Sequence, residues 1–235
     1  MKLLLIDTET NGLPTNRFAP ASEWRSYPAI LQLSWLIYEP CGSVLGDPKE
    51  HRDISVELPA SDIWNTGAAA IHGIPEKTAR SEGIPAAEAL MELYRVLRTV
   101  DCVCAHNLSF DRNIIRAAAY AAADRGGPAA LRSIWPAGIA ELCTMNATRD
   151  LLQLAPGPLS ESKRWKAPRL GELYQWLYSR VYDISGAILH TARSDTHCLS
   201  QCLEALMQRG LLSWSIPTRS WVVSTASATS ALSDS

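Results

Sequence analysis

The sequence lacks a long apolar run. No stretch reaches the roughly 20 apolar residues that are needed to cross a bilayer. Only four apolar residues separate Lys2 from Asp7, which is too short a segment for a secretory signal. We therefore expect an intracellular protein, cytoplasmic or nuclear, with no membrane contact.

The sequence also lacks a C-x-x-C pair, although it contains six cysteines. In a chain of this length without a secretory signal, this scatter favours reduced thiols over a disulfide framework. Cys198 and Cys202 lie four residues apart on an expected helix, with His197 beside them. A zinc site is one interpretation of this group, and two stacked buried thiols are the favoured one.

A global excess of basic charge is missing as well. The chain has 22 Lys and Arg against 24 Asp and Glu, a net charge of −2. Any contact with nucleic acid must therefore come from a local patch. The only dense basic stretch is Lys163-Arg164-Trp165-Lys166, followed by Arg169. This stretch either follows a phosphate backbone, with Trp165 stacking on a base, or is a solvated loop.

The pattern of apolar segments predicts a mixed α/β sheet. A chain of 235 residues with 47% apolar and 20% charged residues suits one globular domain with or without a tail. Three early strands follow one another closely, which predicts an antiparallel meander, and the later strand–helix–strand rhythm predicts parallel pairing. The expected strands cover residues 3–7, 29–38, 52–58, 101–105 and 140–143. The expected helices cover residues 61–71, with Ser61 as the N-cap, 85–98, 110–125, 144–152, 170–178 and 193–209. We expect the domain to span residues 1–212 and residues 213–235 to form a flexible tail rich in Ser, Thr and Ala.

The first strand ends in a pair of acids, Asp7 and Glu9. Side chains alternate along a strand, so these two carboxylates point to the same face. They repel each other unless a cation lies between them, and an all-oxygen cluster of this kind suits Mg²⁺ or Mn²⁺. The alternative is a polar, solvated turn at the end of the strand.

Two more acids occupy expected helix starts, Asp111 and Asp195, and His190 precedes the second of them by five residues. Each helix-start acid can be explained alone, because a negative charge stabilises a helix N-terminus. Together with Asp7 and Glu9, they predict a single acidic site.

These residues carry a family resemblance. Asp7-x-Glu9-Thr10-x-Gly12, then Ala105-His106-Asn107-x-x-Phe110-Asp111, then His190-x-x-x-x-Asp195 resemble the three motifs of the DnaQ-like, DEDDh 3′→5′ exonucleases, which include proofreading epsilon-type and TREX-type enzymes. The similar segments span about residues 1–210. Thr191 stands where the tyrosine branch of the superfamily has its tyrosine, so the histidine branch is the match.

The resemblance implies an RNase H-like fold: a mixed five-stranded sheet, its first three strands antiparallel, flanked by helices. It also implies two Mg²⁺ or Mn²⁺ ions, with Asp7 bridging both, Glu9 and Asp195 on the ion that activates the nucleophile, and Asp111 on the other. His190 would be the general base. The implied substrate contacts are Thr10, Leu13, His72 and Asn107. His72 also has an alternative as a turn-capping histidine, and His106 and His197 are expected to be structural.

The implied function is a metal-dependent 3′→5′ exonuclease that releases nucleoside 5′-monophosphates from single-stranded or frayed DNA ends, in proofreading, repair or degradation. The same chemistry on RNA, as in oligoribonuclease and RNase T relatives, is the alternative, because discrimination rests on contacts to a 2′-hydroxyl. A catalytically silent binding module is a third hypothesis. The expected partner is nucleic acid with a free 3′ end, DNA favoured over RNA, while a polymerase partner and a homodimer are both left open.

Overall fold

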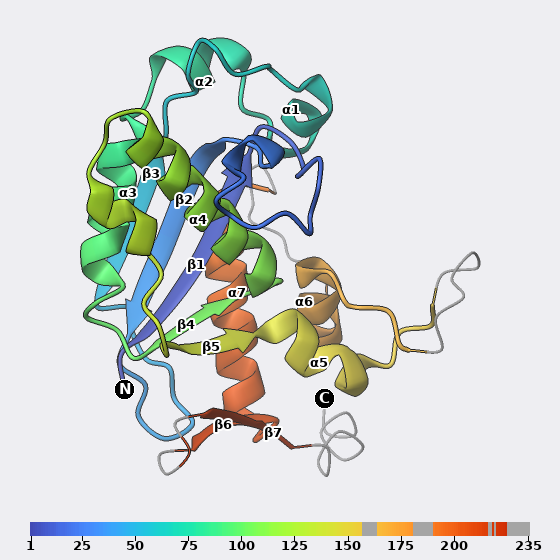
Figure 1. Ribbon diagram of the computed structural model, residues 1–235. Helices are drawn as coiled ribbons and strands as arrows, with labels where there is room; N and C mark the ends of the chain where they lie inside the picture. Colours follow the sequence, from blue (N-terminus) through green and yellow to red (C-terminus); the bar gives the residue numbers. More distant parts are fainter. Residues whose placement is uncertain (157–163, 181–189, 216–217, 219, 225–235) are drawn as a thin grey trace.

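A computed structural model describes residues 1–156, 164–180, 190–215, 218 and 220–224 (Figure 1). Its centre is a five-stranded sheet in the order β3-β2-β1-β4-β5. The strands are β1 (Leu3–Thr10), β2 (Ile30–Tyr38), β3 (Glu50–Ser55), β4 (Cys102–Ala105) and β5 (Ala140–Cys143). The first three strands pair antiparallel, and β4 and β5 join β1 in parallel. The predicted mixed sheet and its pairing are confirmed.

Helices cover both faces of this sheet (Figure 1). The α-helices are α1 (Thr66–His72), α2 (Glu76–Ser81), α3 (Ala86–Val96), α4 (Leu108–Asp124), α5 (Thr144–Leu152), α6 (Leu170–Tyr178) and α7 (Ala192–Gln208). Two short 3₁₀ helices are η1 (Trp24–Ser26) and η2 (Ala129–Ser133). Helices α3 and α4 pack on one face, while α6 and α7 pack on the other.

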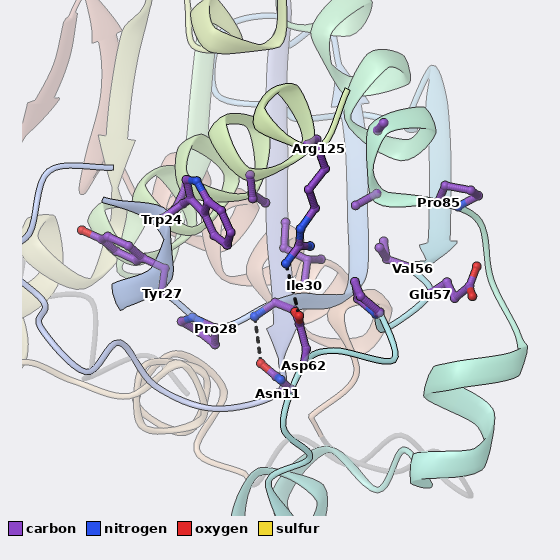
Figure 2. A pocket seen from close by; sticks show the side chains of 18 of the residues that line it. Asn11, Trp24, Tyr27, Pro28, Ile30, Val56, Glu57, Asp62, Pro85 and Arg125 are labelled. Atoms are coloured by element: carbon purple, nitrogen blue, oxygen red, sulfur yellow. Dashed lines mark hydrogen bonds and ion pairs between the residues drawn. The ribbon is translucent and has the colours of Figure 1, made fainter. Parts of the chain in front are cut away.

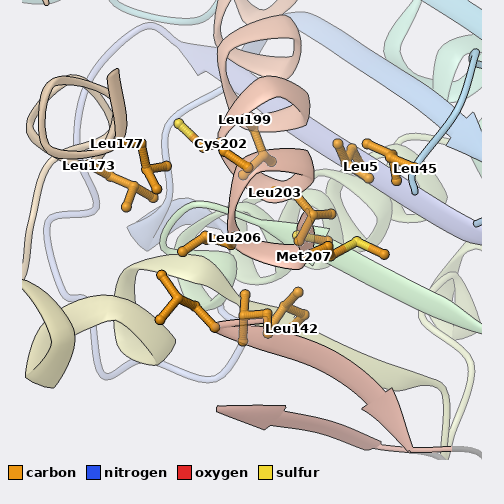
Figure 3. Close-up of a cluster of buried hydrophobic side chains, with 14 of the residues drawn as sticks. Leu5, Leu45, Leu142, Leu173, Leu177, Leu199, Cys202, Leu203, Leu206 and Met207 are labelled. Carbon is orange, nitrogen blue, oxygen red and sulfur yellow. The ribbon is translucent and has the colours of Figure 1, made fainter. Parts of the chain in front are cut away.

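The alternation of side chains in β1 divides the core into two layers. Leu4 and Ile6 face α3 and α4, whereas Leu3 and Leu5 face α7. All four side chains are fully buried, as a central strand covered on both faces requires. Figure 3 shows the α7 layer, in which Leu199, Leu203 and Leu206 lie near Leu173 and Leu177 of α6. By the same alternation, Asp7 and Glu9 lie on the face of β1 that packs against α7.

Two local predictions in the segment between β3 and α3 are wrong. The helix expected from Ser61 begins instead at Thr66, because the Asn65 side chain accepts a hydrogen bond from the Ala68 amide (3.1 Å) and caps it. The turn at His72-Gly73-Ile74 is present, with Gly73 in the left-handed region (φ 70°). After that turn comes α2, a short helix that the pattern did not predict.

Residues just beyond the expected domain boundary form regular structure. Strands β6 (Leu212–Ser215) and β7 (Ser220–Val223) pair antiparallel, so regular structure continues past residue 212, where the domain was expected to end, and the domain boundary stays a prediction. The Trp214 and Trp221 rings meet edge to face, 5.7 Å apart, and Trp221 Nε1 donates to Cys102 Sγ (3.3 Å). Aromatic packing against the core therefore holds this segment, and the last residues of the predicted tail, 225–235, lie outside the described part of the chain.

In the described part of the chain, none of the helices has both the length and the apolar character needed to cross a membrane.

Candidate active site

Three carboxylates converge where β1 ends and α7 begins. One oxygen each from Asp7, Glu9 and Asp195 lies within 4.8 Å of the other two. Asp7 and Glu9 share a face of β1, as predicted, and Asp195 comes from the first turn of α7. Helix α7 packs against β1, so acids that lie far apart in the sequence form one group.

The start of α7 is held by its own capping residues. The Thr191 hydroxyl accepts a hydrogen bond from the Ser194 amide (3.1 Å), and the Ser194 hydroxyl accepts one from the Thr191 amide (3.1 Å). This reciprocal arrangement satisfies amide groups that a helix N-terminus leaves without a partner. It fixes the first turn, and with it the position of Asp195.

Strand β2 anchors the same turn from the sheet. Gln32, opposite Glu9 in the strand register, accepts a hydrogen bond from the Ala192 amide (3.3 Å). Ser34, opposite Asp7, lies 3.0 Å from the Thr196 hydroxyl, and both residues are buried. Gln32 thus links the sheet to the helix that carries Asp195.

Asp111 approaches from the other side of β1. It lies in the first turn of α4 and is 2% exposed. The Thr8 amide and hydroxyl both donate to Asp111 Oδ1, at 3.1 and 2.8 Å. Asp111 is not a member of the group within 4.8 Å, but its charge acts on Asp7 and Glu9.

The pKa values of these acids show how unfavourable their charges are together. Burial raises the pKa of Glu9 to about 8, with Asp195 and Asp111 adding to the shift. Burial raises the pKa of Asp111 to about 7, although the Thr8 hydroxyl opposes the change. Burial and the charges of Asp111, Asp195 and Glu9 raise the pKa of Asp7 well above its usual range. Four crowded oxygen donors that resist ionisation fit hard divalent cations, which would neutralise them.

His190 lies at the entrance to α7. It is exposed and has a left-handed backbone (φ 73°), immediately before the Thr191 cap. Burial raises the pKa of Asp195, and both the charge of His190 and a hydrogen bond from the His190 backbone oppose that rise. The structure therefore brings His190 beside Asp195, while residues 181–189, which precede it, lie outside the described residues.

The four predicted substrate contacts differ in how accessible they are. Leu13 is 78% exposed. Thr10 is buried, and its hydroxyl donates a hydrogen bond to the Gly12 carbonyl (2.7 Å). His72 is buried. Its Nδ1 accepts a hydrogen bond from the Ile74 amide (3.0 Å), and its Nε2 has no hydrogen-bond partner. This contact agrees with the turn-capping alternative for His72. Asn107 has a left-handed backbone (φ 72°) at the start of α4.

A hollow of about 350 Å³ beside Leu13 adds residues that the sequence did not single out. Trp64, Asn65 and Thr66 line it together with Gly12 and Leu13. Trp64 lies in the irregular segment before α1, where no periodic pattern distinguishes it. Its place beside the end of β1 became evident only in the fold.

The other histidines and the paired cysteines have structural surroundings. The two ring nitrogens of His106 bond to the Thr144 hydroxyl (3.0 Å) and the Pro168 carbonyl (2.9 Å), and the His197 ring meets His51 edge to face at 4.9 Å. Cys198 and Cys202 are buried, and a hydrogen bond between them, together with burial, raises the pKa of the Cys198 thiol. Within the described ranges, the one group of His, Cys, Asp and Glu that could hold a metal is Asp7, Glu9 and Asp195.

The basic stretch is partly engaged in local contacts. Lys166 pairs with Glu172, which also accepts a hydrogen bond from the Arg169 amide (2.8 Å). Trp165 is 41% exposed. Lys163 lies outside the described residues, so the phosphate-tracking interpretation of this stretch stays a prediction.

The order of the sheet and the helices that flank it give an RNase H-like fold, as the resemblance predicted. The structure is similar to exonuclease I of E. coli in complex with a dT13 oligonucleotide, with a TM-score of 0.62 and 19% identity over 88% of this chain and 41% of that one. It is also similar to exonuclease I of Methylocaldum szegediense, with a TM-score of 0.60 and 18% identity over 88% of this chain and 40% of that one. This chain therefore spans about two fifths of the length of those enzymes.

A zinc-bound E. coli exonuclease I in complex with single-stranded DNA matches in the same way, with a TM-score of 0.61 and 18% identity over 88% of this chain and 40% of that one. No protein-family model and no curated protein matches the sequence. At this level of identity, the likeness establishes the fold.

Proposed function

We propose that this protein is a metal-dependent 3′→5′ exonuclease that hydrolyses DNA from single-stranded or frayed 3′ ends and releases nucleoside 5′-monophosphates. The observation that carries the proposal is the convergence of Asp7, Glu9 and Asp195 within 4.8 Å on a fold shared with exonuclease I. His190 beside Asp195 completes the set of groups that this chemistry needs.

The four acids are the residues that would hold two Mg²⁺ or Mn²⁺ ions. When bound, these ions would acidify a water and neutralise the negative charge of the reacting phosphate. Asp7, whose pKa responds to all three other acids, would contact both ions, while Glu9 and Asp195 would hold one of them. Asp111, oriented by Thr8, would serve the other.

His190 would accept the proton of the attacking water. Its exposed position lets the imidazole pass that proton to solvent after each cycle. The His190 backbone bond to Asp195 ties the general base to a metal ligand, so both are placed by the start of α7.

Groups around the end of β1 would hold the 3′-terminal nucleotide. Exposed Leu13 can pack against its base, and the backbone around Thr10 can meet its sugar. His72, through its unpartnered Nε2, and Asn107 would line the same site. DNA is favoured over RNA because the similar exonuclease I structures hold DNA oligonucleotides.

A matched pair of 5′-labelled DNA and RNA single strands tests this proposal. With Mg²⁺, the DNA should shorten from its 3′ end, and Asp7→Asn should slow this by about a thousandfold or more. Asp150→Asn, a change of an exposed acid on α5, is the matched control and should leave the rate unchanged.

Faster loss of RNA would replace the proposal by the exoribonuclease alternative. If neither strand shortens and calorimetry detects no Mg²⁺ binding that depends on Asp7, the chain is a silent binding module and the proposal is wrong.

A further inference from the structure

A second, larger cavity of about 590 Å³ lies on the face of the sheet covered by α3 and α4 (Figure 2). Its floor consists of small side chains, above all Ala118 and Ala121 of α4. Trp24 and Tyr27 form one wall, and Arg125 extends into the cavity toward Asp62 (Figure 2). The volume falls within the range of sites for small molecules or single nucleotides.

The groups in this cavity suit a planar, polar heterocycle. The Trp24 ring is fixed by its own hydrogen bond to Asp124 (2.7 Å), and the Arg125 guanidinium lies 5.0 Å from its centre. Arg125 also pairs with Asp62 (3.2 Å). An aromatic ring and a guanidinium plane both stack on nucleobases, and a carboxylate accepts hydrogen bonds from amino and ring N–H groups at a base edge.

The cavity adjoins the hollow beside Leu13. The residues that line both are Asn11, Arg25, Tyr27, Pro28 and Ile63. The smaller hollow begins at Asn11 and Gly12, directly after Thr10 at the end of β1. The two apolar side chains along this route are unusually open to solvent, Leu13 at 78% and Ile63 at 86%. These side chains give an exposed apolar surface between the end of β1 and the cavity, on which bases of a single strand can pack.

We propose that the cavity between Trp24, Arg125 and the α4 alanines receives an unpaired base of the bound strand, upstream of the 3′ end that lies at Asp7 and Glu9. The direction along the strand rests on the proposed function. The occupant is a base of the same strand rather than a free nucleotide, because the cavity shares lining residues with the hollow at Asn11 and Gly12, which directly follow the strand that carries Asp7 and Glu9.

A single abasic position, moved one nucleotide at a time along a 5′-labelled single strand, tests the assignment. Binding is measured by fluorescence anisotropy without metal, so that the strand stays intact. In the unaltered protein, the abasic position should weaken binding about tenfold at one or two adjacent places and little elsewhere. Ala121→Trp fills the cavity and should abolish this dependence on position, with the intact strand binding as weakly as the abasic one.

Two further variants keep the result interpretable. Ala123→Trp places the same ring on α4 outside the cavity and should leave the abasic profile unchanged. Arg125→Gln alters a partly exposed side chain with little risk to folding and should flatten the profile. A profile without a sensitive position, or one that Ala121→Trp and Arg125→Gln leave intact, would overturn the assignment. Competition by a free nucleoside monophosphate without any abasic effect would also overturn it.

Hydrolysis of a labelled dinucleotide with Mg²⁺ separates this proposal from the proposed function. Ala121 lies on α4, away from the acids of β1 and α7, so Ala121→Trp should cleave a dinucleotide, which has a single nucleotide upstream of the 3′-terminal one, at the unaltered rate. Loss of cleavage of every strand by the unaltered protein, with the abasic profile retained, would reject the exonuclease and keep the base site. Normal cleavage with a flat abasic profile would keep the exonuclease and reject the base site.

Discussion

Thr8 donates two hydrogen bonds to one oxygen of Asp111, from its amide (3.1 Å) and from its hydroxyl (2.8 Å). Thr8 lies between Asp7 and Glu9 but points to the opposite face of β1. Strand β1 thus carries Asp7 and Glu9 on one face, and Thr8 on the other face holds Asp111 by hydrogen bonds. This contact fixes α4 relative to the acids of β1.

Thr8→Val should weaken metal binding. The valine keeps the shape and the amide bond but removes the hydroxyl donor, which at present opposes the rise of the Asp111 pKa. A hydrogen bond to a charged group contributes about 1.5–3 kcal/mol, so the dissociation constant for Mg²⁺ should rise by roughly 10- to 150-fold. Calorimetric titration measures this constant, with Thr8→Ser as the control that restores the donor. Equal affinity in the valine variant would show that Thr8 only packs.

Asp7→Asn should abolish hydrolysis and yet stabilise the metal-free protein. The neutral amide avoids the cost of burying a charge and the repulsion from Asp111, Asp195 and Glu9, which together raise the Asp7 pKa. At pH 8 in a chelator, its melting temperature should rise by several degrees, since about 1 kcal/mol corresponds to roughly 2–4 °C in a domain of this size. Asp150→Asn should change neither property, and a lower melting temperature for Asp7→Asn would contradict the repulsion argument.

Stability of the metal-free protein should fall as pH rises from about 4.5 to about 8. The pKa of Glu9 is raised from 4.5 to about 8 and that of Asp111 from 3.8 to about 7, so within this window the folded state binds more protons than the unfolded state. The free energy of unfolding therefore decreases with pH, by at most about 1.4 kcal/mol per pH unit for each group. Thermal unfolding at several pH values, with chelator or with saturating Mg²⁺, measures the slope. The metal should remove it, and a slope that Mg²⁺ leaves unchanged would place its origin elsewhere.

His190→Gln should slow hydrolysis about 10²- to 10⁴-fold without loss of Mg²⁺ affinity, since it removes a proton acceptor and no metal ligand. The hydrolysis rate at saturating Mg²⁺ and the Mg²⁺ affinity from calorimetry are measured at one fixed pH, and His197→Gln, which changes a histidine in contact with His51, is the control. A His190→Gln variant with the unaltered rate would assign the base to another group.

Trp221→Ala should lower the free energy of unfolding by about 1–3 kcal/mol, because it removes a ring that packs on Trp214 and the core. Trp221→Phe keeps most of the ring and loses only the N–H bond to Cys102, so it should cost less. Chemical denaturation of the full chain compares the two. Wild-type stability in the alanine variant would mean that the domain ends at residue 212, as the sequence predicted.

The sequence alone predicted the mixed sheet, which the structure confirms, and the acids that meet at the end of β1, while the class of chemistry stays a proposal. Alternation along residues 3–9 placed Asp7 and Glu9 on one face, because a strand has a period of two whatever packs against it. Helix-start positions identified Asp111 and Asp195, since local backbone rules locate helix ends. The Trp214–Trp221 contact escaped this reasoning because it depends on pairing across a turn and on a distant partner, Cys102.

Only the tertiary structure decided how these pieces meet. The distance between Asp195 and the β1 acids depends on the packing of α7 against the sheet, which no local pattern encodes. The cavity between Trp24, Arg125 and the α4 alanines depends likewise on side chains that are too small to fill the space between α4, α3 and the segment around η1. Local periodicity predicts on which face of a strand or helix a residue lies. A site or a cavity depends on the distances between strands and helices, and the packing of side chains sets those distances.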